Sequence, residues 1–390
     1  MKKNKLIGIV SAFCAFTVLF TFNCNALLYS EISVMGSTVD LGLTAGSACL
    51  MDGATGEILY EHNSREKLEP ASVTKVMTLL LAMEALDNGT ITLDTKICAS
   101  KKASEMGGSQ IWLEYGEELT FDEMLKAIVV VSANDCTVAL AEHLAGSEEA
   151  FCVMMNNRAK ELGMEDTNFL NSTGLPVEGH VTSARDIAIM TRELSKHKTI
   201  FNYTTIWMDS LRNGEMGLSN TNKLIRFYKG ATGMKTGFTS SALYCLSATA
   251  SRDNLDLIAS VMKCQTSDDR FENAKKLLDY GFANFASFTS EVHDIPNIPV
   301  KGGVNESVPV KYSSASALLT KNKMGKVEEE INLPEFLEAP IKKGEKVGEI
   351  IYSVGGEIIA KSDIYAQENI KKSGYGDIIS KIFKKLIMLK

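Results

Sequence analysis

Residues 69–75 of this 390-residue chain read Glu-Pro-Ala-Ser-Val-Thr-Lys, and this stretch does most to define the fold. Proline is favoured in the first turn of a helix, so Pro70 predicts a helix that continues to the stop signal Asn88-Gly89. Its residues are apolar on most sides, which is typical of a buried helix. Ser72 lies among the unpaired N–H groups of the first turn, and Lys75 lies three residues later on the same face. We therefore expect a hydroxyl and an amine side by side at the start of a buried helix.

The spacing Ser-x-x-Lys alone is not specific, because it also begins at Ser64, Ser195 and Ser260. None of these serines follows a proline that opens an apolar helix. Ser260 lies in a strand-like run, where residues three apart face opposite ways. We interpret these three matches as chance spacings.

A second string, Ser132-Ala133-Asn134, occurs once and lies between two predicted helices. A capping box at Thr120 and Glu123 leads into the first helix, residues 124–131, and the second helix covers about residues 135–145. A serine hydroxyl in such a connection can pass on a proton, and an asparagine amide can both donate to and accept from a peptide. The alternative is that both residues only mark helix ends.

A third string, Lys235-Thr236-Gly237, also occurs once, on a predicted strand. A lysine beside a hydroxyl suits a terminal carboxylate, and Gly237 would let the backbone of a ligand lie close to the strand. The alternative is a solvated lysine on an edge strand. Burial near Lys235 would lower the pKa of Lys75 and make it a base for Ser72. Together the three strings supply the groups needed to open a peptide-like carbonyl through an acyl-enzyme.

The periodicity predicts an α+β fold. A hairpin at residues 47–61 and strands at 234–238, 242–250 and 255–264 enclose a helical region, and a helix at 271–280 follows. Strands at both ends of such a region suggest one antiparallel sheet completed by the hairpin. We assign residues 40–285 to this domain and residues 290–368, with their short alternating runs, to a small all-β domain.

Both ends of the chain indicate a membrane context. Residues 1–26 combine three early lysines, an apolar run and a small-residue cleavage site, which predicts a signal peptide. The alternatives are a retained membrane helix and, less well matched, lipidation of Cys24. Residues 374–390 carry an apolar stripe flanked by lysines, which predicts an amphipathic helix on a membrane surface rather than a spanning one. Packing of that helix on its own protein is the alternative.

The net charge of -7 argues against nucleic acid as a partner. There is no Cys-x-x-Cys and no His-Glu-x-x-His, so we expect no metal and no cofactor. Six of the eight cysteines follow the predicted cleavage site. We expect mostly reduced, buried thiols, with Cys49, Cys245 and Cys264 in strands.

In combination, the three strings resemble the signature of the penicillin-recognising serine enzymes. From about Ala48 onward the chain is similar to the low-molecular-mass penicillin-binding proteins that act as D-alanyl-D-alanine carboxypeptidases. The resemblance also rests on residues 182–186 (Thr-Ser-Ala-Arg-Asp) and 233–239 (Gly-Met-Lys-Thr-Gly-Phe-Thr). It implies a transpeptidase-like catalytic domain, a β-rich domain and a C-terminal amphipathic anchor.

The resemblance also implies roles for single residues. Ser72 would be the acylated nucleophile, Lys75 its base, Ser132 the relay to the departing D-alanine, and Asn134 the group that orients the peptide. Their substrate would be a peptidoglycan stem peptide ending in D-Ala-D-Ala, with β-lactams as inhibitors, at the outer face of the cytoplasmic membrane.

The remaining roles concern binding. Lys235 and Thr236 would hold the terminal carboxylate, and the backbone N–H groups of Ser72 and Phe238 would form the oxyanion hole. Arg270, expected in the loop after the last strand, would assist with the carboxylate.

Two other functions fit the same strings. A class A-like β-lactamase would need a Glu-x-x-Leu-Asn element after Asn134, and the nearest candidate, residues 165–171, has its acid at the wrong offset. A catalytically idle penicillin-binding or wall-binding protein is the second alternative, although all motif residues are intact.

Overall fold

The computed structural model describes residues 39–388. The predicted signal peptide at residues 1–26 lies outside the described residues, as do the last two residues of the predicted anchor segment.

Residues 47–62 and 231–264 build one five-stranded sheet with the order β2-β1-β9-β8-β7, and every neighbouring pair is antiparallel. This confirms the predicted sheet and its completion by the N-terminal hairpin. Strand β7 lies at an edge. The bounds are β1 (Ser47–Asp52), β2 (Ile58–His62), β7 (Ala231–Thr239), β8 (Leu243–Arg252) and β9 (Leu255–Cys264).

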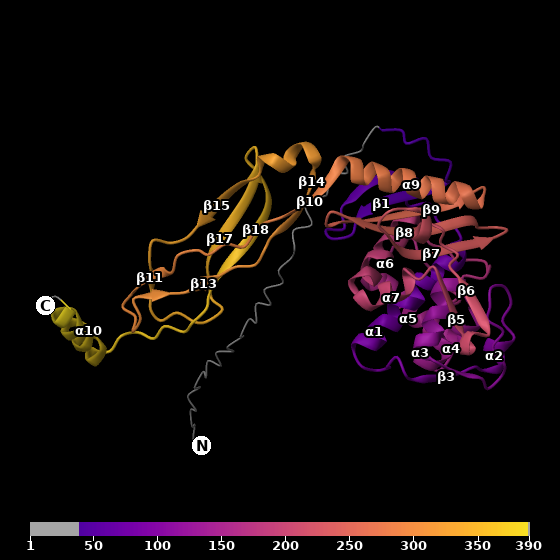
Figure 1. The fold of residues 1–390 in the computed structure, drawn as a ribbon, viewed down its shortest axis with the longest axis horizontal. Coiled ribbons are helices and arrows are strands. Elements are labelled where there is room, and N and C mark those ends of the chain that lie inside the picture. Colours follow the sequence, from indigo (N-terminus) through magenta and orange to yellow (C-terminus); the bar gives the residue numbers. More distant parts are fainter. Residues whose placement is uncertain (1–38, 389–390) are drawn as a thin grey trace, which may run out of the picture. The chain divides into compact units, whose positions relative to one another are not determined.

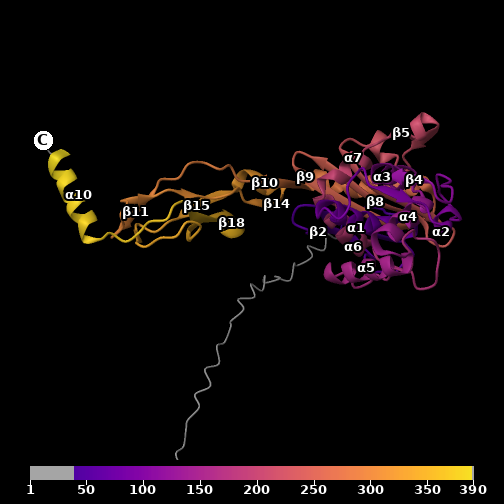
Figure 2. The same cartoon turned by 90° about the horizontal axis from the view of Figure 1, so that it is seen from below.

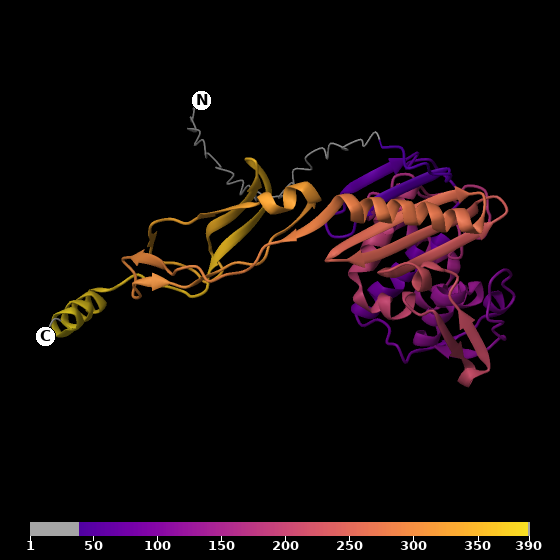
Figure 3. The same ribbon diagram turned by 45° about the horizontal axis from the view of Figure 1, so that its top comes forward.

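Helices cover both faces of this sheet (Figure 1). Helix α9 (Ser267–Asn284) lies across the strands on one face and buries Leu277 and Leu278 against them (Figure 3). Helix α6 (Ala184–Lys196) packs on the other face together with α1 (Lys75–Asp87), within a core that continues into the helical region. The sheet therefore has an apolar layer on each side.

The helix after Pro70 starts differently from the prediction. Residues Ala71–Thr74 form a 3-10 turn, η1, and the α-helix α1 covers Lys75–Asp87 and ends before Asn88, as predicted. Ser72 therefore lies in a tight turn ahead of the helix. All residues of α1 from Lys75 to Met83 are buried, in agreement with its apolar sequence.

The helical region follows the predicted order. Thr120 and Glu123 form the predicted capping box, but the helix they begin changes to a π-helical turn before Ser132. The elements are β3 (Lys96–Cys98), α2 (Lys101–Ser104), β4 (Glu118–Thr120), α3 (Phe121–Lys126), η2 (Ala127–Val131), α4 (Asn134–Ala145), α5 (Glu148–Glu161), α6, η3 (Lys198–Ile200), α7 (Phe201–Thr204), β5 (Met208–Leu211), η4 (Arg212–Gly214), β6 (Met216–Ser219) and α8 (Leu224–Phe227).

The C-terminal region is rich in short strands with a core of its own, which includes Ile350, Tyr352 and Ile364 (Figure 2). Three small sheets are formed by β10 (Phe285–Thr289) with β14 (Ser316–Thr320), by β12 (Ser307–Val308), β11 (Ile298–Lys301) and β16 (Leu337–Glu338), and by β13 (Val310–Lys311), β18 (Glu357–Ala366), β17 (Lys346–Val354) and β15 (Glu328–Asn332). The short helix η5 (Lys321–Lys326) follows β14, and α10 (Tyr375–Met388) ends the described chain.

Candidate active site

The first two sequence strings meet at the amine of Lys75. Its Nζ lies 3.0 Å from Ser72 Oγ and 2.7 Å from Asn134 Oδ1. A third contact, which the sequence did not predict, is the main-chain carbonyl of Thr173 at 2.8 Å. The hydroxyl and amine of the first string are thus paired as predicted, and the second string supplies one further partner.

The surroundings of Lys75 favour an uncharged amine. The side chain is fully buried, and burial followed by the nearby Lys235 ammonium holds the pKa of Lys75 well below its usual range. An uncharged amine has two N–H groups and one electron pair. Because the Asn134 and Thr173 oxygens can take both N–H groups, the electron pair is directed at the Ser72 hydroxyl. This arrangement suits a base that removes the proton of Ser72.

Ser132 and Asn134 are held in a bend between η2 and α4. Ser132 adopts a left-handed conformation with φ 66°, and its buried Oγ has no hydrogen-bond partner among the described residues. The Asn134 side chain donates to the carbonyl of Gly107 at 2.7 Å, which fixes its oxygen toward Lys75. A buried hydroxyl without a partner is costly unless a ligand completes it, so Ser132 is suited to contact a substrate.

The backbone of residues 111–113 is held by Asp135, a residue that the sequence analysis did not select. The buried carboxylate of Asp135 accepts hydrogen bonds from the backbone N–H groups of Ile111 and Leu113 at 3.0 and 3.1 Å. Between them, Trp112 has a positive φ of 56° and an exposed side chain. The sequence signal that could have identified Asp135 is its position directly after the Ser-x-Asn string.

The third string runs along β7 beside η1 (Ala71–Thr74), which we name the nucleophile turn after the expected role of Ser72. A Cβ atom on Gly237 would lie 2.7 Å from the Pro70 carbonyl and 3.0 Å from the Ser72 nitrogen. Gly237 thus admits the backbone of the turn that carries Ser72, and the expectation that it also admits the backbone of a ligand stays a prediction. This close approach brings the start of η1 next to β7, where the N–H groups of Ser72 and Phe238 were expected to act together.

Lys235 is buried although β7 is an edge strand, so the alternative of a solvated lysine is wrong. Burial, together with the nearby Arg270 guanidinium, lowers the pKa of Lys235 to about 7. Its Nζ donates to the Thr236 carbonyl at 3.1 Å, and the Thr236 hydroxyl donates to Thr221 at 2.7 Å. A buried cation with a single protein acceptor can still take an anionic ligand.

Arg270 lies in the first turn of α9, not in the predicted loop. Its Nη1 donates to the Gly237 carbonyl at 3.1 Å, and its guanidinium lies over the rings of Tyr244 and Phe271. Its buried Nε has no hydrogen-bond partner among the described residues. Arg270 thus contacts the backbone of the third string and contributes positive charge near Lys235.

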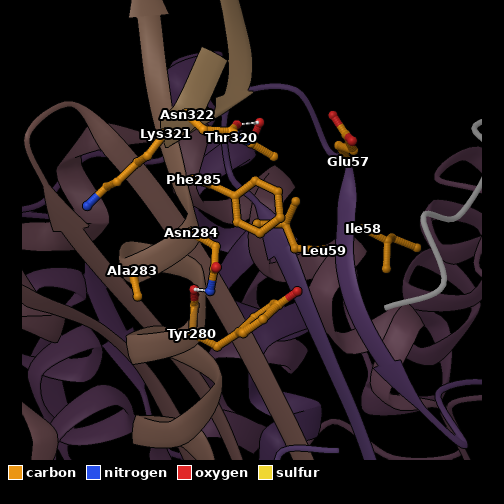
Figure 4. Close-up of a pocket in the computed structure, with 10 residues that line it drawn as sticks. All are labelled: Glu57, Ile58, Leu59, Tyr280, Ala283, Asn284, Phe285, Thr320, Lys321 and Asn322. Atoms are coloured by element: carbon orange, nitrogen blue, oxygen red, sulfur yellow. Dashed lines mark hydrogen bonds between the residues drawn. The ribbon is translucent and has the colours of Figure 1, made fainter. Parts of the chain in front are cut away.

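Other parts of the described chain offer no comparable chemistry. Residues 39–388 contain no cluster of three or more metal-ligating side chains. A hollow of about 600 Å³ is lined by Leu59, Tyr280 and Phe285 (Figure 4). Thr320 also lines this hollow, and its hydroxyl donates a hydrogen bond to the exposed side chain of Asn322. No helix in the described part of the chain is long and apolar enough to cross a membrane.

Comparisons with known proteins identify the family of the chain. The profile of the D-alanyl-D-alanine carboxypeptidase family matches residues 35–266, and that of the penicillin-binding protein 5 C-terminal domain matches residues 291–372. The chain is 43% identical to D-alanyl-D-alanine carboxypeptidase DacF of Bacillus subtilis over 87% of this chain and 89% of that protein. It is 30% identical to carboxypeptidase DacC of Escherichia coli over 95% of this chain and 94% of that protein. The crystal structure of penicillin-binding protein 5 from Haemophilus influenzae is similar with a TM-score of 0.71 and 30% identity, over 85% of this chain and 98% of that one.

Proposed function

The chain belongs to the D-alanyl-D-alanine carboxypeptidase family, and on this basis we propose how its residues remove the terminal D-alanine from peptidoglycan stem peptides. The observation that carries the proposal is that the amine of Lys75 is buried 3.0 Å from the Ser72 hydroxyl, and burial holds the pKa of Lys75 well below its usual range. The catalytic domain would cover residues 40–285 and the β-rich domain residues 290–368.

In the first half of the reaction, Lys75 takes the proton of Ser72 as the serine oxygen bonds to the carbonyl carbon of the penultimate D-alanine. The negative charge on the carbonyl oxygen faces the N–H groups of Ser72 and Phe238. Ser132 then passes the proton from Lys75 to the departing nitrogen, and the carbon–nitrogen bond breaks. The free carboxylate of the leaving D-alanine is held by Lys235 and Thr236.

In the second half, a water molecule gives a proton to Lys75 and its oxygen bonds to the ester carbon. The ester bond to Ser72 breaks, and the serine oxygen regains a proton from Lys75. Asn134 keeps the peptide amide aligned throughout, because its side chain is fixed by Gly107. A β-lactam enters the same first half, since its strained amide presents a carbonyl and a carboxylate with similar spacing.

The geometry supports the carboxypeptidase over the β-lactamase alternative. Glu165, the acid considered for activating water, forms an ion pair with Arg65 at 2.8 Å and is 74% exposed. The segment that reaches Lys75 presents the carbonyl of Thr173, not a carboxylate. No acid of this segment is therefore placed to activate water for rapid ester hydrolysis.

The test is release of D-alanine from a synthetic peptide ending in D-Ala-D-Ala. Ser72→Ala should abolish both this release and labelling by a fluorescent penicillin. Ser195→Ala is the matched control, because Ser195 and Lys198 have the same spacing outside the site, and it should leave both activities intact. Unchanged release by Ser72→Ala would refute the proposal. Labelling of the wild-type protein without any release would support the idle binding protein.

We also propose that α10 attaches the enzyme to a membrane surface. The exposed fractions of Ile379, Ile382 and Phe383 are 57%, 54% and 63%, so much of the apolar face of this helix is solvent-exposed. An exposed apolar helix face of this kind suits the boundary between lipid headgroups and acyl chains. Deleting residues 376–390 should abolish binding to vesicles containing anionic lipids while release of D-alanine in solution is retained. Equal vesicle binding by the truncated and full-length proteins would refute the anchor.

A further inference from the structure

His180 is a buried residue that the reaction described above does not use. It is 2% exposed, and both ring nitrogens are engaged. The backbone N–H of Leu170 donates to Nδ1 at 3.0 Å, so Nδ1 carries no proton. Nε2 lies 2.8 Å from Thr74 Oγ1 and is then the protonated nitrogen that donates to it. A doubly protonated ring would place two donors against each other at Leu170, and burial lowers the pKa of His180 to about 4.

These two hydrogen bonds connect a loop to the nucleophile turn. Leu170 and His180 enclose the loop of residues 170–180, and Thr74 directly precedes Lys75. The loop and the turn are in backbone contact, because a Cβ atom on Gly174 would lie 1.8 Å from the Ala71 carbonyl and 2.8 Å from Thr74 Oγ1. The position of the loop is thus set against the turn that carries Ser72.

The loop supplies one of the two acceptors that orient the Lys75 amine. Its Thr173 carbonyl lies 2.8 Å from Nζ, and the neighbouring Ser172 carbonyl accepts from Thr78 on α1 at 2.8 Å. If the Thr173 carbonyl moved away, one N–H of the amine would lose its partner and the amine could rotate. Its electron pair would then no longer be directed at Ser72.

We propose that His180 is a positioning residue for acylation, which holds residues 170–180 on Thr74 so that the Thr173 carbonyl orients the Lys75 amine toward Ser72. The inference rests on the proposed role of Lys75 as the base. A histidine that only fills space would act through its volume and its edge contact with Phe169, whose ring centre is 5.8 Å away. The positioning role requires the hydrogen bonds of His180 to Leu170 and Thr74, whereas the space-filling role does not.

The experiment compares three variants of the full chain. His180→Phe keeps an aromatic ring of similar size but loses both hydrogen bonds, His180→Gln retains an acceptor and a donor, and Thr74→Val removes the hydroxyl. For each, the first-order rate constant of acylation by a fluorescent penicillin and the dissociation constant of the preceding complex are measured. The kcat and KM of D-alanine release and the thermal midpoint are measured alongside.

Loss of one hydrogen bond at the base corresponds to about a 10-fold lower rate. His180→Phe and Thr74→Val should each lower the acylation rate constant and kcat by about this factor, with KM and the dissociation constant within about twofold of wild type. His180→Gln should recover most of the rate. The double variant Thr74→Val with His180→Phe should be no slower than either single variant by more than about twofold, because both remove the same link.

Three results would overturn the proposal: a wild-type acylation rate in His180→Phe, a slower acylation rate in His180→Gln than in His180→Phe, or additive losses in the double variant. If His180→Phe does not fold, Thr74→Val carries the same test, and a wild-type rate in that variant would overturn the role. A wild-type protein that is neither acylated nor releases D-alanine would instead refute the proposed function itself, so the two failures are distinguishable.

Discussion

Replacement of Lys235 by methionine should stabilise the fold while it removes activity. Burial lowers the pKa of Lys235 from 10.5 to about 7. Each unit of difference between folded and unfolded pKa corresponds to about 1.4 kcal/mol, so keeping this ammonium in the fold costs roughly 5 kcal/mol. Methionine has a similar volume and no charge. After subtracting about 1 kcal/mol for the hydrogen bond to the Thr236 carbonyl, we expect a gain of up to about 4 kcal/mol.

The sign of the pH dependence follows from where the proton is held. Below pH 7 Lys235 is protonated in both the folded and the unfolded chain, and the full cost is present. Between pH 7 and 10.5 the unfolded chain keeps the proton and the folded chain releases it, so the cost falls as the pH rises. The stabilisation by Lys235→Met should therefore be largest at pH 6 and nearly absent at pH 10.

Urea denaturation of the wild type and Lys235→Met at pH 6, 8 and 10 tests this reasoning. Lys96→Met is the matched control, because the Lys96 side chain is 68% exposed and its replacement should change stability little at any of these pH values. The kcat/KM for D-alanine release should fall about 100-fold in Lys235→Met, as for loss of a buried charge-assisted bond worth about 3 kcal/mol. A variant that is less stable than wild type at pH 6, or a stability difference that does not change with pH, would refute the argument.

Three further outcomes are expected. Gly174→Ala should lower the free energy of unfolding by about 2–4 kcal/mol and slow acylation, since its Cβ would overlap a main-chain carbonyl at 1.8 Å. The control Gly163→Ala, at a glycine with a similar φ and open space around it, should lower the free energy of unfolding by only about 1–2 kcal/mol. Equal effects of the two substitutions would contradict this prediction. Asp135→Asn should cost about 1.5–3 kcal/mol, because two backbone donors lose a charged acceptor, and an unchanged urea midpoint would contradict it. Binding of a D-Ala-D-Ala peptide to the Ser72→Ala protein at pH 8 should take up a proton, because the peptide carboxylate raises the pKa of the neighbouring Lys235. Calorimetry in buffers of different ionisation enthalpy measures this uptake, and binding without proton uptake would contradict the prediction.

The fold could be predicted well from local sequence patterns. Alternation of apolar residues located all five strands of the main sheet, and the capping box at Thr120 located α3. The prediction for α9 began four residues late, at Phe271, although Thr266 and Asp269 form a capping box that marks its start. That error also placed Arg270 in a loop.

The site could be predicted only where its residues form short strings. The contact of Lys75 with Ser72 was expected, but its contacts with the Asn134 side chain and with the carbonyl of Thr173 were not. A main-chain carbonyl carries no side-chain signal, and its position depends on how a loop folds back over the nucleophile turn. His180 was missed for the same reason, since its partners Leu170 and Thr74 are brought to it by tertiary packing.

Each positively charged side chain of this site lowers the pKa of the next one. Arg270 contributes to the lowered pKa of Lys235, and Lys235 contributes to the lowered pKa of Lys75. In both cases burial is the larger cause, so the neighbouring charge adjusts a pKa that the fold has already lowered. A substrate carboxylate would partly neutralise Lys235 and allow it to remain protonated, while burial keeps the pKa of Lys75 well below its usual range. The same burial that makes both lysines unfavourable for stability thus lets one bind an anion and the other accept a proton within a single site.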